Sequence, residues 1–204
     1  MALAVIVDTI SNMAATSLRK RRTAGAIMSD DASPAITAQQ VMDLLGMKPL
    51  TFEGGYFAET HRAGALAPEH VPWAPADHRS LKTAIYYLLT PDTMSAMHLL
   101  PGDEVFHHYL GDAVQQLQLF PDGAGEMVTI GNDLLAGERP QVVVPGGVWQ
   151  GALLVPERFG FALMGTTMAP GFDHRDFQPG SFTMLRERFP DWENEIAARL
   201  PSRT

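Results

Sequence analysis

A histidine and a glutamate on either side of a tight turn are the residues of this chain best suited to chemistry. They are His98 and Glu104, separated by Pro101-Gly102. An imidazole titrates near neutral pH and can accept or donate a proton. A nearby carboxylate can orient that imidazole or bind a metal ion. The pair therefore suggests a site for proton transfer or for a metal.

Two short strands must position this pair. Residues 94–100 and 104–109 are rich in strand-forming side chains and flank the turn. Because side chains alternate between the faces of a strand, Glu104, Phe106 and His108 should share one face. We predict that this face lines a polar pocket and that these three side chains contact a substrate.

The length of the turn decides whether His98 and Glu104 meet. With a two-residue loop, His98 would lie opposite Val105. With a three-residue loop, Leu100 would pair with Glu104, and the imidazole and the carboxylate would converge. Hairpin loops of three residues with a glycine are common, and Pro-Gly suits them. We therefore expect a hairpin that brings the two groups to one wall.

The middle of the chain consists of eight short runs rich in Val, Ile, Leu, Tyr and Phe, with Gly, Pro and Asp between them. Many short strands at fairly regular spacing indicate an antiparallel β-sandwich or barrel. Helices are expected only outside this region, which disfavours a parallel-sheet enzyme. The runs are residues 83–89, 94–100, 104–109, 114–120, 127–130, 141–144, 151–155 and 161–168.

A helix is predicted on each side of the strands. Thr37 is suited to cap the first helix, with Gln40 three residues later as its capping-box partner. Ser181 or Thr183 would cap the last helix, and Pro190 would interrupt it.

Length and composition limit the class of protein. The 204 residues suit an N-terminal extension, residues 1–36, followed by a single domain, residues 37–204. A net charge of −8, with no basic stripe beyond residues 19–22, disfavours nucleic acid as a partner. No apolar run approaches the roughly 18 residues of a membrane helix. The lack of cysteine excludes disulfides and is consistent with the expected cytoplasmic location.

Two motifs and six sequence blocks resemble known cupins. Residues 98–111 resemble the first cupin motif, H-x-H-x(3,4)-E-x6-G, and residues 145–150 resemble the second, P-x-G-x2-H. The blocks are similar to those of the small cupins often labelled predicted sugar epimerases. This resemblance implies an all-β, cupin-type jelly-roll β-sandwich with flanking helices and a small-molecule pocket in the barrel mouth. The blocks are residues 53–60, 83–89, 95–98, 103–107, 144–149 and 169–172.

The chain departs from the cupin pattern at two metal positions. Leu100 and Gln150 stand where the motifs have histidine. One hypothesis is a divalent transition metal (Fe, Ni, Mn or Zn) held by His98, Glu104 and Gln150, with His108 as a further candidate. The alternative is a metal-free pocket in which His98, Glu104 and Gln150 hydrogen-bond the ligand directly.

The leading functional hypothesis is an isomerase or epimerase acting on a carbohydrate-like or carbonyl compound. Epimerisation next to a carbonyl needs a base to remove a proton and an acid to return it on the other face. His98 is the expected base and Tyr86 or Tyr87 the expected acid, while Gln150 would hydrogen-bond the enolate. This assignment follows the superfamily's deoxysugar-nucleotide 3,5-epimerases, which use a histidine base and a tyrosine acid.

Two other functions remain open at this point. A bound metal would make the protein a metal-dependent cupin of the oxygenase kind, and a pocket without turnover would make it a ligand-binding protein. In each case Trp149 would contribute to the pocket wall with Phe106. Because the edge strands of a sandwich must be covered, we also expect a two-fold homodimer.

Overall fold

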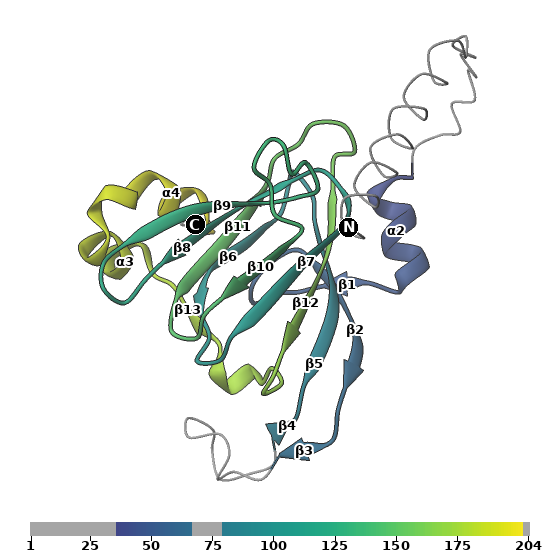
Figure 1. Ribbon diagram of the computed structural model, residues 1–204, viewed down its shortest axis with the longest axis horizontal. Helices are drawn as coiled ribbons and strands as arrows, with labels where there is room; N and C mark the ends of the chain where they lie inside the picture. Colours follow the sequence, from purple (N-terminus) through teal and green to yellow (C-terminus); the bar gives the residue numbers. More distant parts are fainter. Residues whose placement is uncertain (1–35, 67–78, 202–204) are drawn as a thin grey trace, which may run out of the picture. The chain divides into compact units, whose positions relative to one another are not determined.

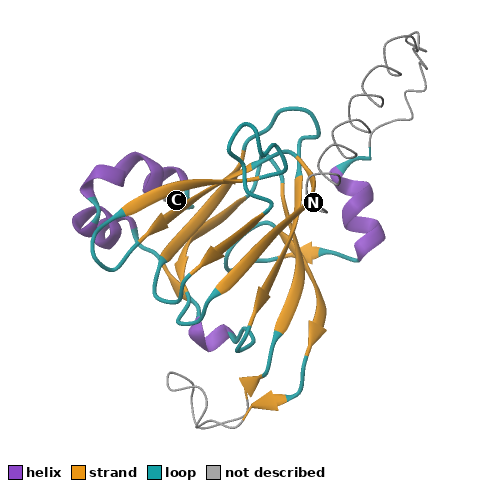
Figure 2. Cartoon of the chain, in the orientation of Figure 1, coloured by secondary structure: helices purple, strands orange, loops and turns teal. Residues whose placement is uncertain are grey.

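The described part of the chain is built mainly from β-strands. The computed structural model describes residues 36–66 and 79–201, so the predicted extension lies outside the described residues except for Ile36. The strands form two antiparallel sheets, drawn in Figures 1 and 2. This arrangement confirms the predicted all-β sandwich.

The two sheets have six and five strands in the described chain. The first sheet has the order β1 (Lys48–Pro49), β2 (Tyr56–Arg62), β5 (Thr83–Leu89), β12 (Ala162–Met168), β7 (Glu104–Gly111) and β10 (Gln141–Val144). The second has the order β13 (Gln178–Pro179), β6 (Met94–Leu99), β11 (Trp149–Leu154), β8 (Val114–Leu119) and β9 (Gly125–Ile130). Strands β3 (Ala65–Leu66) and β4 (Arg79–Ser80) pair separately.

A hydrophobic core fills the space between the sheets. Alternation along each strand sends every second side chain inwards. Tyr87 and Leu89 from β5, Phe106 from β7 and Met164 from β12 meet there with almost no solvent exposure. The opposite faces of the strands are left for helices to cover.

Helices pack on the outer face of each sheet. The helices are α2 (Ala38–Leu45), α3 (Phe182–Arg188) and α4 (Glu193–Ala198), with 3-10 turns η2 (His174–Asp176) and η3 (Pro190–Trp192). Val41 of α2 packs against Leu88 of the first sheet, and Leu185 of α3 packs with Leu117 of the second. Figure 1 shows α3 and α4 together beside β8 and β9.

The predicted helix ends are confirmed. Thr37 and Gln40 form a reciprocal capping box, and Gly46 ends α2 in the left-handed conformation. Ser181 caps α3 by accepting a hydrogen bond from the N–H of Met184. The proline interruption separates α3 from α4 as expected.

All eight predicted strands occur, with ends shifted by at most two residues. Strand β2 was not among the predicted runs because it ends in four polar residues, Glu59 to Arg62, and lacks the alternation of a half-buried strand. It is nevertheless paired along its length with β5. Its polar end belongs to the candidate site described below.

The predicted hairpin between residues 94–100 and 104–109 is wrong. Strand β6 pairs with β11 and β13, whereas β7 pairs with β12 and β10, so both edges of each strand are already occupied. The turn instead crosses from one sheet to the other. It is held by the facing loop, where the Gly147 N–H donates to Leu100 O at 2.8 Å and the Gly146 N–H donates to Asp103 Oδ1 at 2.8 Å.

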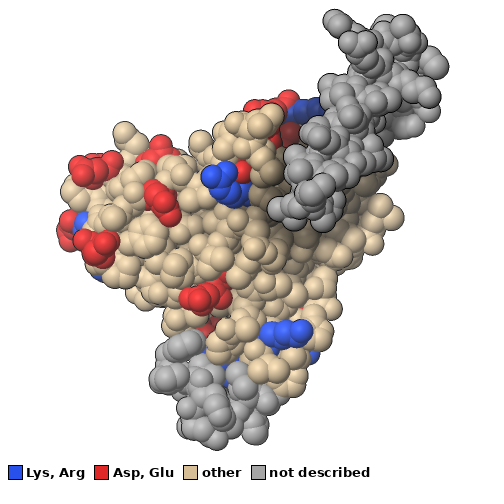
Figure 3. All heavy atoms as spheres, in the orientation of Figure 1, with Lys and Arg blue, Asp and Glu red and all other residues tan. Residues whose placement is uncertain are grey.

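No helix in the described ranges is long and apolar enough to cross a membrane. Figure 3 shows acidic side chains gathered at the end where α3 and α4 lie, and only scattered basic groups on the same face. This distribution agrees with the net charge of −8.

Gly111, the last residue of the first motif, should tolerate no side chain. Its φ is +98°, and an added Cβ would lie 2.1 Å from Phe161 O. Gly123 has a similar φ of +96° but has open space around it. We expect Gly123→Ala to cost about 1 kcal/mol and Gly111→Ala about 3 kcal/mol or more, measured by urea unfolding. Equal losses would mean that steric overlap at Gly111 has no effect.

Candidate functional site

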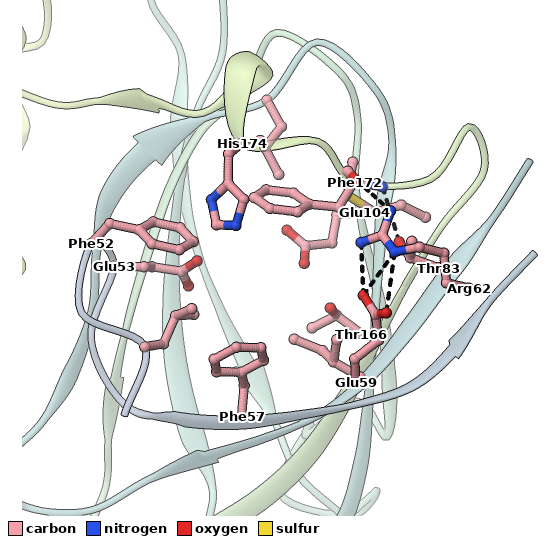
Figure 4. Close-up of a pocket in the computed structure, with 14 residues that line it drawn as sticks. Phe52, Glu53, Phe57, Glu59, Arg62, Thr83, Glu104, Thr166, Phe172 and His174 are labelled. Atoms are coloured by element: carbon pink, nitrogen blue, oxygen red, sulfur yellow. Dashed lines mark hydrogen bonds and ion pairs between the residues drawn. The ribbon is translucent and has the colours of Figure 1, made fainter. Parts of the chain in front are cut away.

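A cavity of about 90 Å³ opens between the sheets beside β2, β5, β7 and β12. This equals about three water molecules at ~30 Å³ each, so it can enclose a compact ligand or one end of a larger one. Figure 4 shows the side chains that border it. Its polar side chains are Glu53, Glu59, Arg62, Thr83, Glu104 and Thr166, and its rings are those of Phe52, Phe57, Phe172 and His174.

Two of the three carboxylates that line this cavity, those of Glu53 and Glu104, come from different elements and are not part of an ion pair in the described chain. Glu53 lies in the turn between β1 and β2, and Ser95 Oγ donates to its Oε1 at 2.7 Å. Glu104 begins β7 and accepts a hydrogen bond from Gln150 Nε2 at 2.8 Å. In Figure 4 both carboxylates point into the cavity, and neither is hydrogen-bonded to the other.

Burial raises the pKa of Glu104, and the negative charge of Glu53 raises it further. His98, Thr166 and Gln150 pull in the opposite direction without reversing the shift. Glu104 therefore keeps its proton to a higher pH than a solvated glutamate does. Such perturbed carboxyl groups in a cavity are typical of sites that exchange protons with a ligand.

A β-bulge in β6 turns Ser95 and His98 to the same side. Residues three apart point to opposite faces of a regular strand. Between the cross-strand pairs His98–Gln150 and Ser95–Ala152, β6 has two residues where β11 has only Gly151. The extra residue brings both side chains to the interior, and bulges are common beside active sites.

A second bulge, in β2, turns the side chains of Glu59 and Arg62 to the same side of that strand. Thr60 is the extra residue, so both neighbouring charged side chains reach the cavity mouth. Arg62 pairs with Glu59 at 2.7 Å and donates from Nη1 to Phe172 O at 3.2 Å. This pair is about half exposed, and it leaves Arg62 with both ends of its guanidinium occupied.

Three buried glutamines form a hydrogen-bonded chain that ends on Glu104. Gln118 Nε2 donates to Gln116 Oε1 at 2.9 Å, and Gln116 Nε2 donates to Gln150 Oε1 at 3.3 Å. Gln150 Nε2 in turn donates to Glu104. Each amide is thus oriented towards the carboxylate, and bonds in such a chain polarise one another.

His98 lies in the interior beside the cavity but does not line it. Its Nδ1 is 2.8 Å from Ala96 O, which can only accept, so Nδ1 carries the proton. The ring stacks on Phe177 with centroids 5.0 Å apart, and the buried Nε2 has no hydrogen-bond partner among residues 36–66 and 79–201. Gln150 connects the two predicted site residues, because it is the cross-strand partner of His98 and its side chain donates to Glu104 in the other sheet.

The structure separates the two candidate tyrosines. Tyr87 faces the interior, and its hydroxyl donates to Gly54 O at 3.1 Å. Burial, with the nearby charge of Glu53, raises the pKa of Tyr87 well above its usual value, so it stays protonated. Tyr86 lies on the outer face, where its ring contacts Tyr109 at a centroid distance of 6.1 Å.

The other predicted substrate contacts do not line the cavity. Phe106 is part of the core. His108 points inwards, but Nε2 donates to Asp112 O and Nδ1 accepts from Asn132, both at 2.9 Å. Trp149 faces outwards and packs with the C-terminal helices.

The donor atoms do not fit the transition-metal site predicted on His98, Glu104 and Gln150. Gln150 turns its amide nitrogen towards Glu104, and its oxygen already accepts from Gln116. His108 has no free ring nitrogen. In residues 36–66 and 79–201, no three His, Asp or Glu side chains gather as a metal ion requires.

Sequence reasoning identified only Glu104 among the residues that line the cavity. Glu53, Phe57 and Glu59 lie in the first block of the cupin resemblance, residues 53–60. The block marked this segment as similar to other cupins but did not indicate a function for these residues. Arg62 lies just beyond that block and carried no signal. Phe172 ends the last block.

Comparisons with known proteins agree with this architecture. The uncharacterized protein YML079W of Saccharomyces cerevisiae is 35% identical over an alignment of 133 residues, and the match covers 61% of this chain and 66% of the yeast protein. A hypothetical protein from Leishmania major has a TM-score of 0.72 at 28% identity, covering 81% of this chain and 99% of that one. Protein SO0799 from Shewanella oneidensis has a TM-score of 0.72 at 27% identity, covering 82% of this chain and 99% of its own.

The sequence also matches a protein family over most of the strands of the two sheets. Residues 39–179, from α2 to β13, match the family described as Cupin superfamily (DUF985). The match includes both carboxylates and every other side chain named above as lining the cavity. With that extent of sequence match and two solved structures of the same fold, this chain belongs to the cupin superfamily.

Proposed function

We propose that this protein is a small-molecule isomerase or epimerase that moves a proton at the carbon next to a carbonyl group. The observation that carries the proposal is the pair Glu53 and Glu104, which enter one cavity from different elements. The raised pKa of Glu104 suits a group that gains and loses a proton during the reaction.

The two carboxylates supply the two proton transfers. One carboxylate removes the proton from carbon, which leaves an enolate, and the other returns a proton to the opposite face. Their roles exchange in the reverse direction. Thr83 and Thr166 border the same cavity and offer hydroxyl groups to a polar substrate. Because the mouth is open to water, protons on the carboxylates exchange with solvent between turnovers.

His98 and Tyr87 become positioning residues in this scheme. The cavity does not reach His98, but His98 lowers the pKa of Glu104 and so opposes part of the rise caused by burial. Tyr87 holds the turn that carries Glu53 through its bond to Gly54. The roles of base for His98 and acid for Tyr87, expected from the superfamily, pass to the carboxylates because these border the cavity.

Solvent isotope exchange tests the proposal without knowledge of the natural substrate. The protein is incubated in D₂O with keto- and aldosugars, free and phosphorylated, and ¹H NMR follows the proton next to each carbonyl. We expect protein-dependent loss of that signal for at least one compound. Binding without exchange for every compound that binds would instead favour a ligand-binding cupin without turnover.

A further inference from the structure

We infer that the ligand of this cavity carries a positively charged amine, which lies between Glu53 and Glu104 and against the phenylalanine rings. This inference rests on the proposed function, because it names the chemical class of the same site's substrate. It follows from the charge of the cavity, from the rings around it and from the hydrogen bonds that its polar groups already make.

The cavity has an unbalanced negative charge. Arg62 is the cationic side chain of its described lining, and Arg62 is paired with Glu59. In the described chain the hydrogen-bond donors to these two carboxylates are neutral groups, Ser95 for Glu53 and Gln150 with Thr166 for Glu104. Neither forms an ion pair within residues 36–66 and 79–201. Two carboxylates in one partly buried cavity repel one another, and a bound cation would remove that cost.

The histidines around the cavity do not replace such a cation. His98 stacks on Phe177, its Nδ1 donates to the backbone carbonyl of Ala96, and its buried Nε2 has no hydrogen-bond partner in the described chain. His174 is exposed at the mouth and packs edge-on against Phe52 and Phe172. Neither histidine forms a salt bridge with Glu53 or Glu104 in the described chain.

The rings provide the second half of the site. Phe52, Phe57 and Phe172 border the cavity on different sides in Figure 4. The face of a phenyl ring carries negative potential and attracts a desolvated cation. Phe57 already makes such a contact, because Lys48 Nζ lies 5.3 Å from the centroid of its ring although Lys48 does not line the cavity. Carboxylates and aromatic faces together favour an ammonium over a neutral hydroxyl.

The substrate class follows from this site and from the proposed proton transfer. An ammonium group fits the enclosed volume of about 90 Å³, and the rest of the molecule can extend through the mouth past Arg62. An amino sugar, or another compound with both an amine and a carbonyl, meets both requirements.

The test compares pairs of compounds that differ in charge at one position. Choline and its carbon isostere 3,3-dimethyl-1-butanol form one pair, and glucosamine and glucose form the other. Isothermal titration calorimetry on the full chain at neutral pH should give about tenfold tighter binding of the charged member of each pair. In Glu53→Gln and in Glu104→Gln the charged and neutral members of each pair should bind with nearly equal affinity, which is a loss of about tenfold in preference. Glu126→Gln, an exposed carboxylate on β9, is the matched control and should leave it unchanged.

Each outcome decides the inference. Equal or tighter binding of the neutral members, or no binding of any compound at millimolar concentration, overturns it. A preference for charge that survives both Glu53→Gln and Glu104→Gln also overturns it. Charge-selective binding without isotope exchange would support the inference while contradicting the proposed isomerase. Isotope exchange on neutral sugars without a preference for charged ligands would support the proposed isomerase and contradict the inference of an amine ligand.

Discussion

Glu104→Gln should reduce isotope exchange by about a hundredfold to ten-thousandfold while leaving the fold intact. Removing a group that transfers a proton in the rate-limiting step typically has an effect of this size. Glutamine keeps the shape of the side chain and still accepts a hydrogen bond from Gln150, so the chain of buried amides can persist. The NMR exchange assay measures the loss, with Glu126→Gln as the control of equal charge change.

The same substitution should make the protein more stable near neutral pH. Burial and Glu53 raise the pKa of Glu104 in the folded state, so ionising it costs stability as pH rises from its unfolded pKa through its folded pKa. Glu104→Gln does not titrate, so its stability relative to the native chain should increase over that interval. Urea unfolding at several pH values measures the difference. If Glu104→Gln is more stable and less active than the native chain, its loss of activity comes from the missing carboxylate and not from unfolding.

The variant His98→Asn tests the alternative that His98, and not Glu104, is the base. Asparagine can still donate to Ala96 O, but it removes the imidazole from the interior. If His98→Asn abolished exchange and Glu104→Gln retained it, the base would be His98 after all. We expect instead that His98→Asn retains measurable exchange with an altered pH profile, because His98 acts on the reaction by lowering the pKa of Glu104.

The fold could be predicted from sequence because its signals are local. A run of strand-forming residues marks strands such as β5 within seven positions, and the capping box at Thr37 and Gln40 needs only four. Strand pairing is not local. The turn at Pro101-Gly102 was suited to a hairpin, and nothing nearby in the sequence indicated that β6 would find its partner in β11 instead.

The site was less predictable because it is assembled across both sheets. Glu53 and Ser95 are 42 positions apart, and Glu104 and Gln150 are 46 apart. The two bulges also break the period-two rule at the positions where charged or polar side chains must turn inwards. Alternation alone therefore assigns Arg62 to the wrong face when Glu59 is placed on the inner one.

The scaffold around the site depends on one buried carboxylate. Asp112, which follows Gly111, accepts hydrogen bonds from the backbone N–H groups of residues 157–160 at 2.7–3.1 Å. These residues form the loop between β11 and β12, and Asp112 is only 6% exposed. The carboxylate thus satisfies four donors that secondary structure leaves without partners. It joins the end of β7, which begins with Glu104, to the strand that carries Thr166.

Asp112→Ala should therefore cost about 3–5 kcal/mol of unfolding free energy, because it removes the acceptor that four backbone N–H groups share. Asp112→Asn keeps one acceptor oxygen and should cost less. Asp122→Ala is the matched control, since Asp122 is exposed and accepts from one backbone N–H, that of Ala124 at 3.0 Å; its loss should not exceed about 1 kcal/mol. Urea unfolding at neutral pH measures all three, and similar losses for Asp112→Ala and Asp122→Ala would contradict the anchoring role.

The pH dependence of the stability loss shows whether the loop depends on the negative charge of Asp112 or only on the shape of its side chain. Burial alone would raise the pKa of Asp112, but the N–H donors of Phe159, Arg158, Glu157 and Gly160 outweigh it and lower the pKa. A depressed pKa contributes stability that is fully present above the unfolded value of about 3.9 and is lost as pH falls through the folded pKa. The difference in stability between the native chain and Asp112→Asn should therefore be constant above about pH 5 and shrink in more acidic solution. A difference that did not change with pH would show that the loop needs the shape of this side chain and not its charge.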